Sequence, residues 1–127
     1  MAMAAPDNPP TDDPIFHLAM PDAWAAAFRS GEYLDSTRDM SLDEVGFIHC
    51  STRDQLESTA NRFYADVDQL VLLTIEPVLI PSRIIFEPPA PNSPLLFPHI
   101  YGPLPVSAVN LASPWSRSAE VWSLTTL

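Results

Sequence analysis

Three histidines occur in the chain, and each lies in a short apolar motif typical of a β-strand. The motifs are IFHL around His17, GFIHCS around His49 and FPHIYGPL around His99. Imidazole titrates near neutral pH, can donate and accept hydrogen bonds at once, and binds metals readily. Three imidazoles that converge from separate strands could therefore serve as an acid, a base and an orienting group. The alternative is that each histidine is a core or rim residue hydrogen-bonded to the backbone.

Three further residues have side chains that could contact a ligand. Glu87 ends an apolar segment and could orient an imidazole or act as a general base, although an exposed carboxylate at a strand end fits the same pattern. Tyr101 offers a ring for stacking a flat substrate and a hydroxyl for hydrogen bonding, or it fills a sheet edge. Ser51, in the string GFIHCST, is the third candidate for ligand binding.

Cys50 is the single cysteine and cannot form an internal disulfide, which agrees with a reducing compartment and excludes a cysteine-rich zinc cage. Consecutive strand residues point to opposite faces, so Cys50 and His49 are not expected to pair as nucleophile and base. A buried, inert thiol is favoured. A zinc site of three histidines is conceivable, but the histidines lack the local spacing of metal ligands, and we expect no metal.

The charge of the chain argues against nucleic acid as a partner. Sixteen acidic and six basic side chains give a formal net charge of -10, and the six basic residues are arginines scattered along the chain. Such a surface repels phosphate backbones, although a single arginine could still hold one phosphate. A small-molecule ligand, neutral or cationic, is therefore the expected partner. The sequence leaves the oligomeric state open.

Several motifs that would define a reaction are absent. The chain has three glycines and contains no GxxxxGK[ST] loop, GxGxxG turn or GxSxG elbow. This argues against nucleoside triphosphate hydrolysis, Rossmann dinucleotide binding and serine hydrolysis. No apolar run approaches the roughly 20 residues that a membrane-spanning helix needs, and the N-terminus lacks the pattern of a secretory signal. We therefore expect no membrane partner and a cytoplasmic location.

The elements that would position these residues alternate between strands and helices. The strongest strand covers residues 70–75, whose branched residues predict a central strand covered on both sides. Asp22 is placed to cap a helix that ends before Gly31, and either Ser51 with Asp54 or Thr52 with Gln55 forms a capping box for a second helix. A helical turn is expected at residues 41–45, and further strands at residues 15–20, 47–51, 83–87, 99–104 and 107–112.

These elements predict a single α+β domain over residues 15–127, with a split, mixed β-sheet and two main helices. Residues 1–14 combine proline, small residues and acids with almost nothing apolar to bury, which is typical of a disordered leader. Prolines 88, 89, 91 and 94 prevent regular structure before the third histidine. Residues 113–127 carry two tryptophans and form either a docked extension or a partly ordered tail.

The order of the motifs resembles a known family. The strings IFH, GEY, GFIHCST, ANRFY, LVLL, FEP and LFPHIYGPLP, between residues 14 and 112, are similar to those of small bacterial proteins called domain of unknown function 952. The resemblance implies a fold related to the ADP-ribosyltransferases, which hold NAD in a cleft of a split β-structure. It also implies that His17 hydrogen-bonds a ribose. The catalytic glutamate of that superfamily opens a later strand, where this chain has His99, and a neutral histidine supplies no formal negative charge to an oxocarbenium-like transition state.

These expectations combine into one functional hypothesis and one alternative. The hypothesis is an ADP-ribosyltransferase-like enzyme, or a degenerate enzyme, that acts on a ribose-bearing ligand. His17 and His99 contact that ligand, His49 is the acid, base or orienting group, and Tyr101 is a stacking platform. The alternative is a non-catalytic module that binds a small metabolite or takes part in a protein complex. The cofactor is unknown, with NAD possible, and whether the chain is an enzyme stays open.

Overall fold

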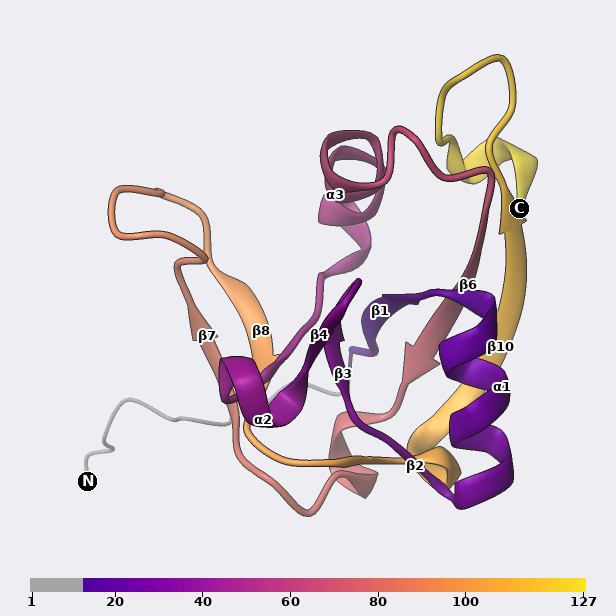
Figure 1. Cartoon of the computed structure of the whole chain (residues 1–127). Coiled ribbons are helices and arrows are strands. Elements are labelled where there is room, and N and C mark those ends of the chain that lie inside the picture. Colours follow the sequence, from indigo (N-terminus) through magenta and orange to yellow (C-terminus); the bar gives the residue numbers. More distant parts are fainter. Residues whose placement is uncertain (1–12) are drawn as a thin grey trace.

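Two three-stranded sheets meet at the first strand of the chain (Figure 1). The computed structural model describes residues 13–127, so the predicted leader, residues 1–14, lies almost wholly outside the described residues. The first sheet has the order β1-β6-β10, and its strands are β1 (Ile15–Ala19), β6 (Gln69–Ile75) and β10 (Val109–Ser116). The second has the order β5-β8-β7, and its strands are β5 (Ile48–His49), β8 (Phe97–Ile100) and β7 (Ile84–Glu87). The predicted central strand is β6, which pairs on both sides.

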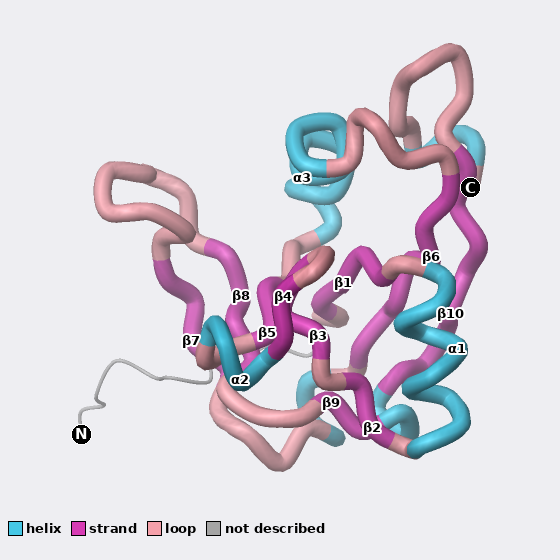
Figure 2. The backbone as a smooth tube through the Cα atoms, in the orientation of Figure 1, coloured by secondary structure: helices cyan, strands magenta, loops and turns pink. Residues whose placement is uncertain are grey.

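The two sheets are joined by one pair of backbone hydrogen bonds. Phe16 N donates to the Ser51 carbonyl over 2.8 Å, and Ser51 N donates to the Phe16 carbonyl over 2.7 Å. β1 therefore pairs with β6 on one side and touches the end of β5 on the other (Figure 2). The β-structure is split at this seam.

Every strand pairing in the described part of the chain is antiparallel, so the expected mixed sheet is wrong. The reason lies in the connection from β5 through a helix to β6. Such a crossover normally joins parallel neighbours, but here β1 lies between the two strands and is antiparallel to both. A helix therefore connects β5 to β6, as expected, but the two strands do not pair with each other.

Two main helices cover the sheets, as predicted. The helix α1 (Pro21–Ser30) ends at Gly31, which has the left-handed φ of 97° that the prediction required. Its N-cap is Met20 rather than the predicted Asp22, because Pro21 takes the first helical position, where no N–H is needed. The helix α3 (Leu56–Phe63) follows the 3-10 turn η1 (Arg53–Gln55), and the capping box that forms is the one of Thr52 with Gln55. The predicted turn at residues 41–45 is α2 (Leu42–Val45).

Short elements complete the chain. Four strands were not expected, namely β2 (Glu32–Tyr33), which pairs with β9 (Leu104–Pro105), and β3 (Asp35–Thr37), which pairs with β4 (Met40–Ser41). The strand predicted at 99–104 begins earlier, at Phe97. The segment predicted as a strand at 107–112 begins as the 3-10 turn η3 (Val106–Ala108) and continues as β10. Two more 3-10 turns are η2 (Pro77–Leu79) and η4 (Leu124–Thr126).

The core has two parts, one on each side of the first sheet. The larger contains Ile48, Leu73 and Ile100 and fills the space under both sheets. The smaller contains Leu56, Trp115 and Trp122 and supports α3. The C-terminal segment is therefore docked on α3. Among residues 13–127, no helix is long and apolar enough to cross a membrane.

Candidate functional site

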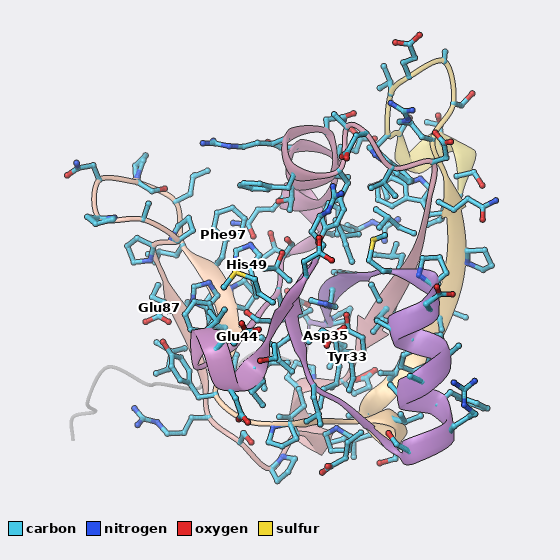
Figure 3. The ribbon with its side chains drawn as sticks, in the orientation of Figure 1. Tyr33, Asp35, Glu44, His49, Glu87 and Phe97 are labelled. Carbon is cyan, nitrogen blue, oxygen red and sulfur yellow. The ribbon has the colours of Figure 1, made fainter. Side chains whose placement is uncertain are left out.

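One face of the second sheet carries the polar side chains that the sequence singled out. His49 lies directly opposite His99 in the β5-β8 pairing. Glu87 is two residues from Ile85, the β7 partner of His99, so it lies diagonally across from His99 on the same face. Figure 3 shows His49 and Phe97 beside β8 and Glu87 on β7. The alternation of strand side chains turns Ile48 and Cys50 to the other face, where both are buried.

A chain of hydrogen bonds runs across this face. Tyr101 donates its hydroxyl hydrogen to Glu87 Oε2. The same carboxylate oxygen accepts from His99 Nδ1 over 2.7 Å. His99 Nε2 and His49 Nδ1 are 3.1 Å apart. The ring of Phe47 stacks on His99 with centroids 3.9 Å apart and an angle of 12°, which fixes the plane of the imidazole.

These partners determine where each imidazole carries its hydrogen. A carboxylate only accepts, so His99 has its hydrogen on Nδ1 and accepts at Nε2. His49 must then donate from Nδ1 to His99. The remaining nitrogen, His49 Nε2, carries a lone pair and has no hydrogen-bond partner among the described residues. The chain Glu87, His99, His49 therefore presents one oriented base at its end.

His17 reaches the same region from the first sheet. Its Nδ1–H donates to the backbone carbonyl of His49 over 2.7 Å, across the seam between the sheets. Its Nε2 accepts from the Tyr33 hydroxyl over 2.9 Å. His17 is 3% exposed and both of its nitrogens are bonded within the protein. Its contacts hold the strand that carries His49.

Burial keeps the histidines neutral. It lowers the pKa of His17 to about 4 against the opposing effect of its backbone hydrogen bond. Burial, with the nearby His99 and His17, also lowers the pKa of His49 to about 4. Burial lowers the pKa of His99, although Glu87 acts in the opposite direction. Burial raises the pKa of Glu87, but the hydrogen bonds from Tyr101 and His99 outweigh it and leave that pKa below its usual value.

A narrow cleft lies beside His49. It has about 20 Å³ of free volume, which is room for about one water molecule. Residues from both sheets, from α3 and from the β3-β4 hairpin surround it, and none of them is a carboxylate or an arginine. They are His17, Leu18, Thr37, His49, Ser51, Thr59, Phe63 and Tyr64.

The structure brings together most of the predicted site residues, with different exposures. Ser51 lines the cleft, but it is 3% exposed and its hydroxyl contacts Thr59 over 3.5 Å. His99 is 1% exposed and has both nitrogens bonded. Tyr101 lies at the far end of the hydrogen-bond chain, is 39% exposed and does not line the cleft. Burial, together with its bond to Glu87, raises the pKa of Tyr101 to about 12.

Sequence reasoning missed several residues of this region. Tyr33, Thr37 and Tyr64 supply hydroxyls to His17 or the cleft, and the Phe97 ring lies 5.1 Å from the His49 ring. Tyr33 and Thr37 lie in short polar segments that lack the alternation of a strand, so no pattern in the sequence indicates them. Phe97 stands two residues before His99, so the period of a strand could have placed it on the histidine face.

The described residues do not assemble a metal centre. No group of three or more His, Cys, Asp or Glu side chains in residues 13–127 is arranged to hold a metal ion. The histidine nitrogens explain this, because all except His49 Nε2 are used in hydrogen bonds within the protein. The buried Cys50 contributes no thiolate, since burial raises its pKa.

A comparison with models of known protein families finds one that matches this chain. The model of the family described as "Protein of unknown function (DUF952)" matches residues 18–112, three quarters of the sequence. The chain belongs to the DUF952 family. Its match includes all the cleft residues except His17, which lies just before the matched region. No curated protein matches this DUF952 chain.

Solved structures of CC0527 from Caulobacter crescentus resemble this DUF952 protein. The crystal structure is 31% identical, covers 88% of this chain and 95% of its own, and has a TM-score of 0.74. A double mutant of the same protein gives the same values. The solution structure is 27% identical, covers 87% of this chain and 91% of its own, and has a TM-score of 0.67. The small α+β domain is therefore shared with CC0527.

Proposed function

We propose that the cleft binds a small hydroxyl-bearing molecule and that His49 acts there as a general base. The observation that carries this proposal is the uncommitted lone pair on His49 Nε2, at the end of the hydrogen-bond chain from Glu87 through His99. A buried structural histidine would have both nitrogens bonded, as His17 does. His49 is only partly buried and borders the cleft.

The chemistry follows from the hydrogen positions. His49 Nε2 removes the proton from a hydroxyl that hydrogen-bonds to it, and the imidazolium that forms keeps its Nδ1–H bond to His99. Glu87 is ionised at neutral pH, because its pKa lies below the usual value. Its negative charge, transmitted through the His99 ring, stabilises the positive charge on His49. The oxygen that loses the proton becomes the nucleophile.

A ribose-bearing ligand such as NAD fits this proposal, because its ribose carries the hydroxyl groups from which His49 would accept a proton. The split β-structure and the position of His17 on the first strand support an ADP-ribosyltransferase-like enzyme or a degenerate relative of one. The residues lining the cleft are uncharged, so the groups in place favour hydroxyl activation over stabilisation of an oxocarbenium ion. Only one end of a ligand as large as NAD would enter a cleft of about 20 Å³.

Within this proposal, His17 and His99 position the site and His49 contacts the ligand. Glu87 orients His99 and Ser51 borders the ligand, whereas Tyr101 fixes Glu87 through its hydroxyl. The alternative function, a non-catalytic module for a small metabolite, is favoured by the pKa of about 4 of His49. A base that weak is a good hydrogen-bond acceptor and a poor proton acceptor at pH 7.

Two substitutions of His49 separate these functions. In His49→Asn, the side-chain amide replaces Nδ1 and can still donate to His99, but nothing replaces Nε2. In His49→Gln, the amide oxygen can take the place of Nε2 as an acceptor, but it cannot accept a proton. For a catalyst, both variants should lower turnover by about 100-fold or more. For a binding module, the Gln variant should keep the ligand affinity and the Asn variant should weaken it about fivefold.

The measurement is calorimetric titration with NAD, ADP-ribose and ribose 5-phosphate, followed by assay of product formation by mass spectrometry. Ser58→Ala is the matched control, because Ser58 is exposed on α3 next to the cleft residue Thr59. Wild-type affinity and turnover in folded His49→Asn would refute both functions. Unfolding of both variants, shown by circular dichroism, would assign His49 to the core.

A further inference from the structure

The rim of the cleft holds an arginine whose geometry fits an anion. Arg38 follows the cleft residue Thr37 at the tip of the β3-β4 hairpin. Its guanidinium faces the turn after α3, where Nη1 and Nη2 donate to the two carboxylate oxygens of Asp66 over 2.7 and 3.1 Å. This paired geometry is the one in which arginine binds a carboxylate or a phosphate.

Neutral groups of the cleft wall also contact this guanidinium. Arg38 Nη1 also donates to the Phe63 carbonyl over 3.1 Å, and the guanidinium carbon lies 5.5 Å from the centre of the Tyr64 ring. Phe63 and Tyr64 both line the cleft. The cation is therefore fixed against the cleft wall by neutral groups, and its donor pair is aimed outward at an anion.

Asp66 is poorly placed to be a permanent partner. Its side chain is 73% exposed, whereas that of Arg38 is 29% exposed. Exposed ion pairs contribute about 0 to 1 kcal/mol to stability, and the paired geometry of Arg38 and Asp66 puts this pair at the upper end of that range. A ligand anion that also binds elsewhere in the cleft can therefore replace the Asp66 carboxylate at small cost. The net charge of -10 favours a neutral or cationic ligand, and the fixed cation of Arg38 beside an uncharged cleft is a local exception to that field.

We infer that Arg38 binds an anionic group, a phosphate or carboxylate, of the cleft's ligand, in exchange for Asp66. This inference rests on the proposed function, because it gives the hydroxyl-bearing ligand of His49 a second attachment point. The substrate class becomes small phosphorylated or carboxylated molecules with a free hydroxyl. Asp66 then competes with the anion of the ligand for the Arg38 guanidinium, so an anion that binds weakly is released.

The substitutions that test this assignment have opposite expected effects. Arg38→Ala removes the cation and should raise the Kd for ribose 5-phosphate about 10- to 100-fold. Asp66→Asn removes the competing carboxylate and should lower that Kd about threefold or more. If the ion pair only fastened the hairpin over the cleft, both substitutions would loosen it and would shift the Kd in the same direction. Arg38→Lys keeps the charge without the paired donors and should fall between wild type and Arg38→Ala.

A second ion pair in the same turn provides a matched control. Arg117 Nη2 donates to Asp68 over 2.8 Å, and Arg117 Nη1 donates to the Ala65 carbonyl. This arrangement copies that of Arg38, but Arg38 contacts the cleft residues Phe63 and Tyr64, whereas Ala65 and Asp68 do not line the cleft. Arg117→Ala and Asp68→Asn should therefore change the Kd for ribose 5-phosphate by less than about twofold.

Two probes separate a failure of this inference from a failure of the proposed function. Titration of the wild-type protein with inorganic phosphate or acetate, followed by nitrogen-15 NMR of the arginine side chains, should shift the Arg38 Nε–Hε signal more than that of Arg117. Equal shifts, or Kd values that move together in the Arg38 and Asp66 variants, would overturn the inference. Binding of ribose 5-phosphate that depends on His49 and not on Arg38 would overturn it and leave the proposed function intact. If none of the ribose probes binds, both are wrong.

Discussion

Lowering the pH from 7 to 4 is expected to reduce the free energy of unfolding by about 3 kcal/mol through His17 alone. His17 is 3% exposed, and burial lowers its pKa from 6.5 to about 4. Each unit of pKa difference between the folded and unfolded chains corresponds to about 1.4 kcal/mol. The lowering of the His17 pKa from 6.5 to about 4 therefore gives the expected loss in the free energy of unfolding.

The sign follows from which state binds the proton. The unfolded chain protonates His17 as the pH falls through about 6.5, whereas the folded chain does so only near pH 4. Between these values unfolding takes up one proton, so acid favours the unfolded state. The slope should be about 1.4 kcal/mol per pH unit inside this window, with no contribution from His17 above it and no further loss below it.

The assay is urea denaturation at pH 7, 6, 5 and 4 for the wild type and His17→Asn. The Asn amide can still donate to the His49 carbonyl but does not titrate, and the Tyr33 hydroxyl loses its acceptor. The variant should therefore be less stable at pH 7 by about 1 to 3 kcal/mol. Its pH slope should be shallower than that of the wild type by about one proton. His49 and His99 titrate in both proteins, so most of their contribution cancels in the difference, and the part that remains is the small effect of His17 on the pKa of His49.

Two results would contradict this reasoning. The first is an equal pH slope in the wild type and in His17→Asn. The second is an NMR titration in which the His17 imidazole of the folded protein protonates near pH 6.5. Either result would mean that water reaches the His17 ring and that the hydrogen bonds to His49 and Tyr33 do not keep it neutral.

The remaining predictions concern the hydrogen-bond chain and one tight contact. Glu87→Gln keeps an acceptor for His99 Nδ1 but removes the charge, so turnover at His49 should fall about 10- to 100-fold. The Kd for ribose 5-phosphate should change by less than about threefold. Steady-state kinetics measures the turnover and calorimetry measures the Kd, and an equal loss in both would contradict the role assigned to Glu87. Gly102→Ala would place its Cβ against the Ser82 hydroxyl and 2.7 Å from the Ser82 Cβ, so urea denaturation should show a loss of about 1 to 3 kcal/mol. Adding Ser82→Gly should restore part of that stability, and no restoration would mean that the contact is not the cause.

Local patterns were sufficient where neighbouring residues alone decide the structure. The alternation around His49 placed Cys50 on the opposite face, and the structure buries it there. The stop at Gly31 was also correct, because the left-handed conformation at this point depends on the absence of a Cβ. For the second helix, two capping boxes were equally good by spacing. The structure forms the one at Thr52 because the Ser51 backbone pairs with Phe16.

Contacts between distant segments decide the rest. His49 and His99 are 50 residues apart in sequence, and their pairing depends on the register of β5 against β8, which no local pattern specifies. The short strands β3 and β4 have polar residues and no clear alternation, so the hairpin that carries Thr37 and Arg38 was not predicted. The predicted strand began at His99, whereas β8 begins at Phe97 and includes Pro98, whose carbonyl accepts from Cys50 N over 2.9 Å across the sheet.

The docking of the C-terminal segment on α3 sets a limit on how the chain can be shortened. The family match ends at Ala112, but Trp115 and Trp122 lie beyond it, and both are buried in the core that supports α3. Trp122 Nε1 donates to the carbonyl of the cleft residue Tyr64 over 2.8 Å. A chain cut after Ala112 would retain every histidine and still lose the support under one wall of the site. The functional unit therefore extends past the segment by which the family is recognised.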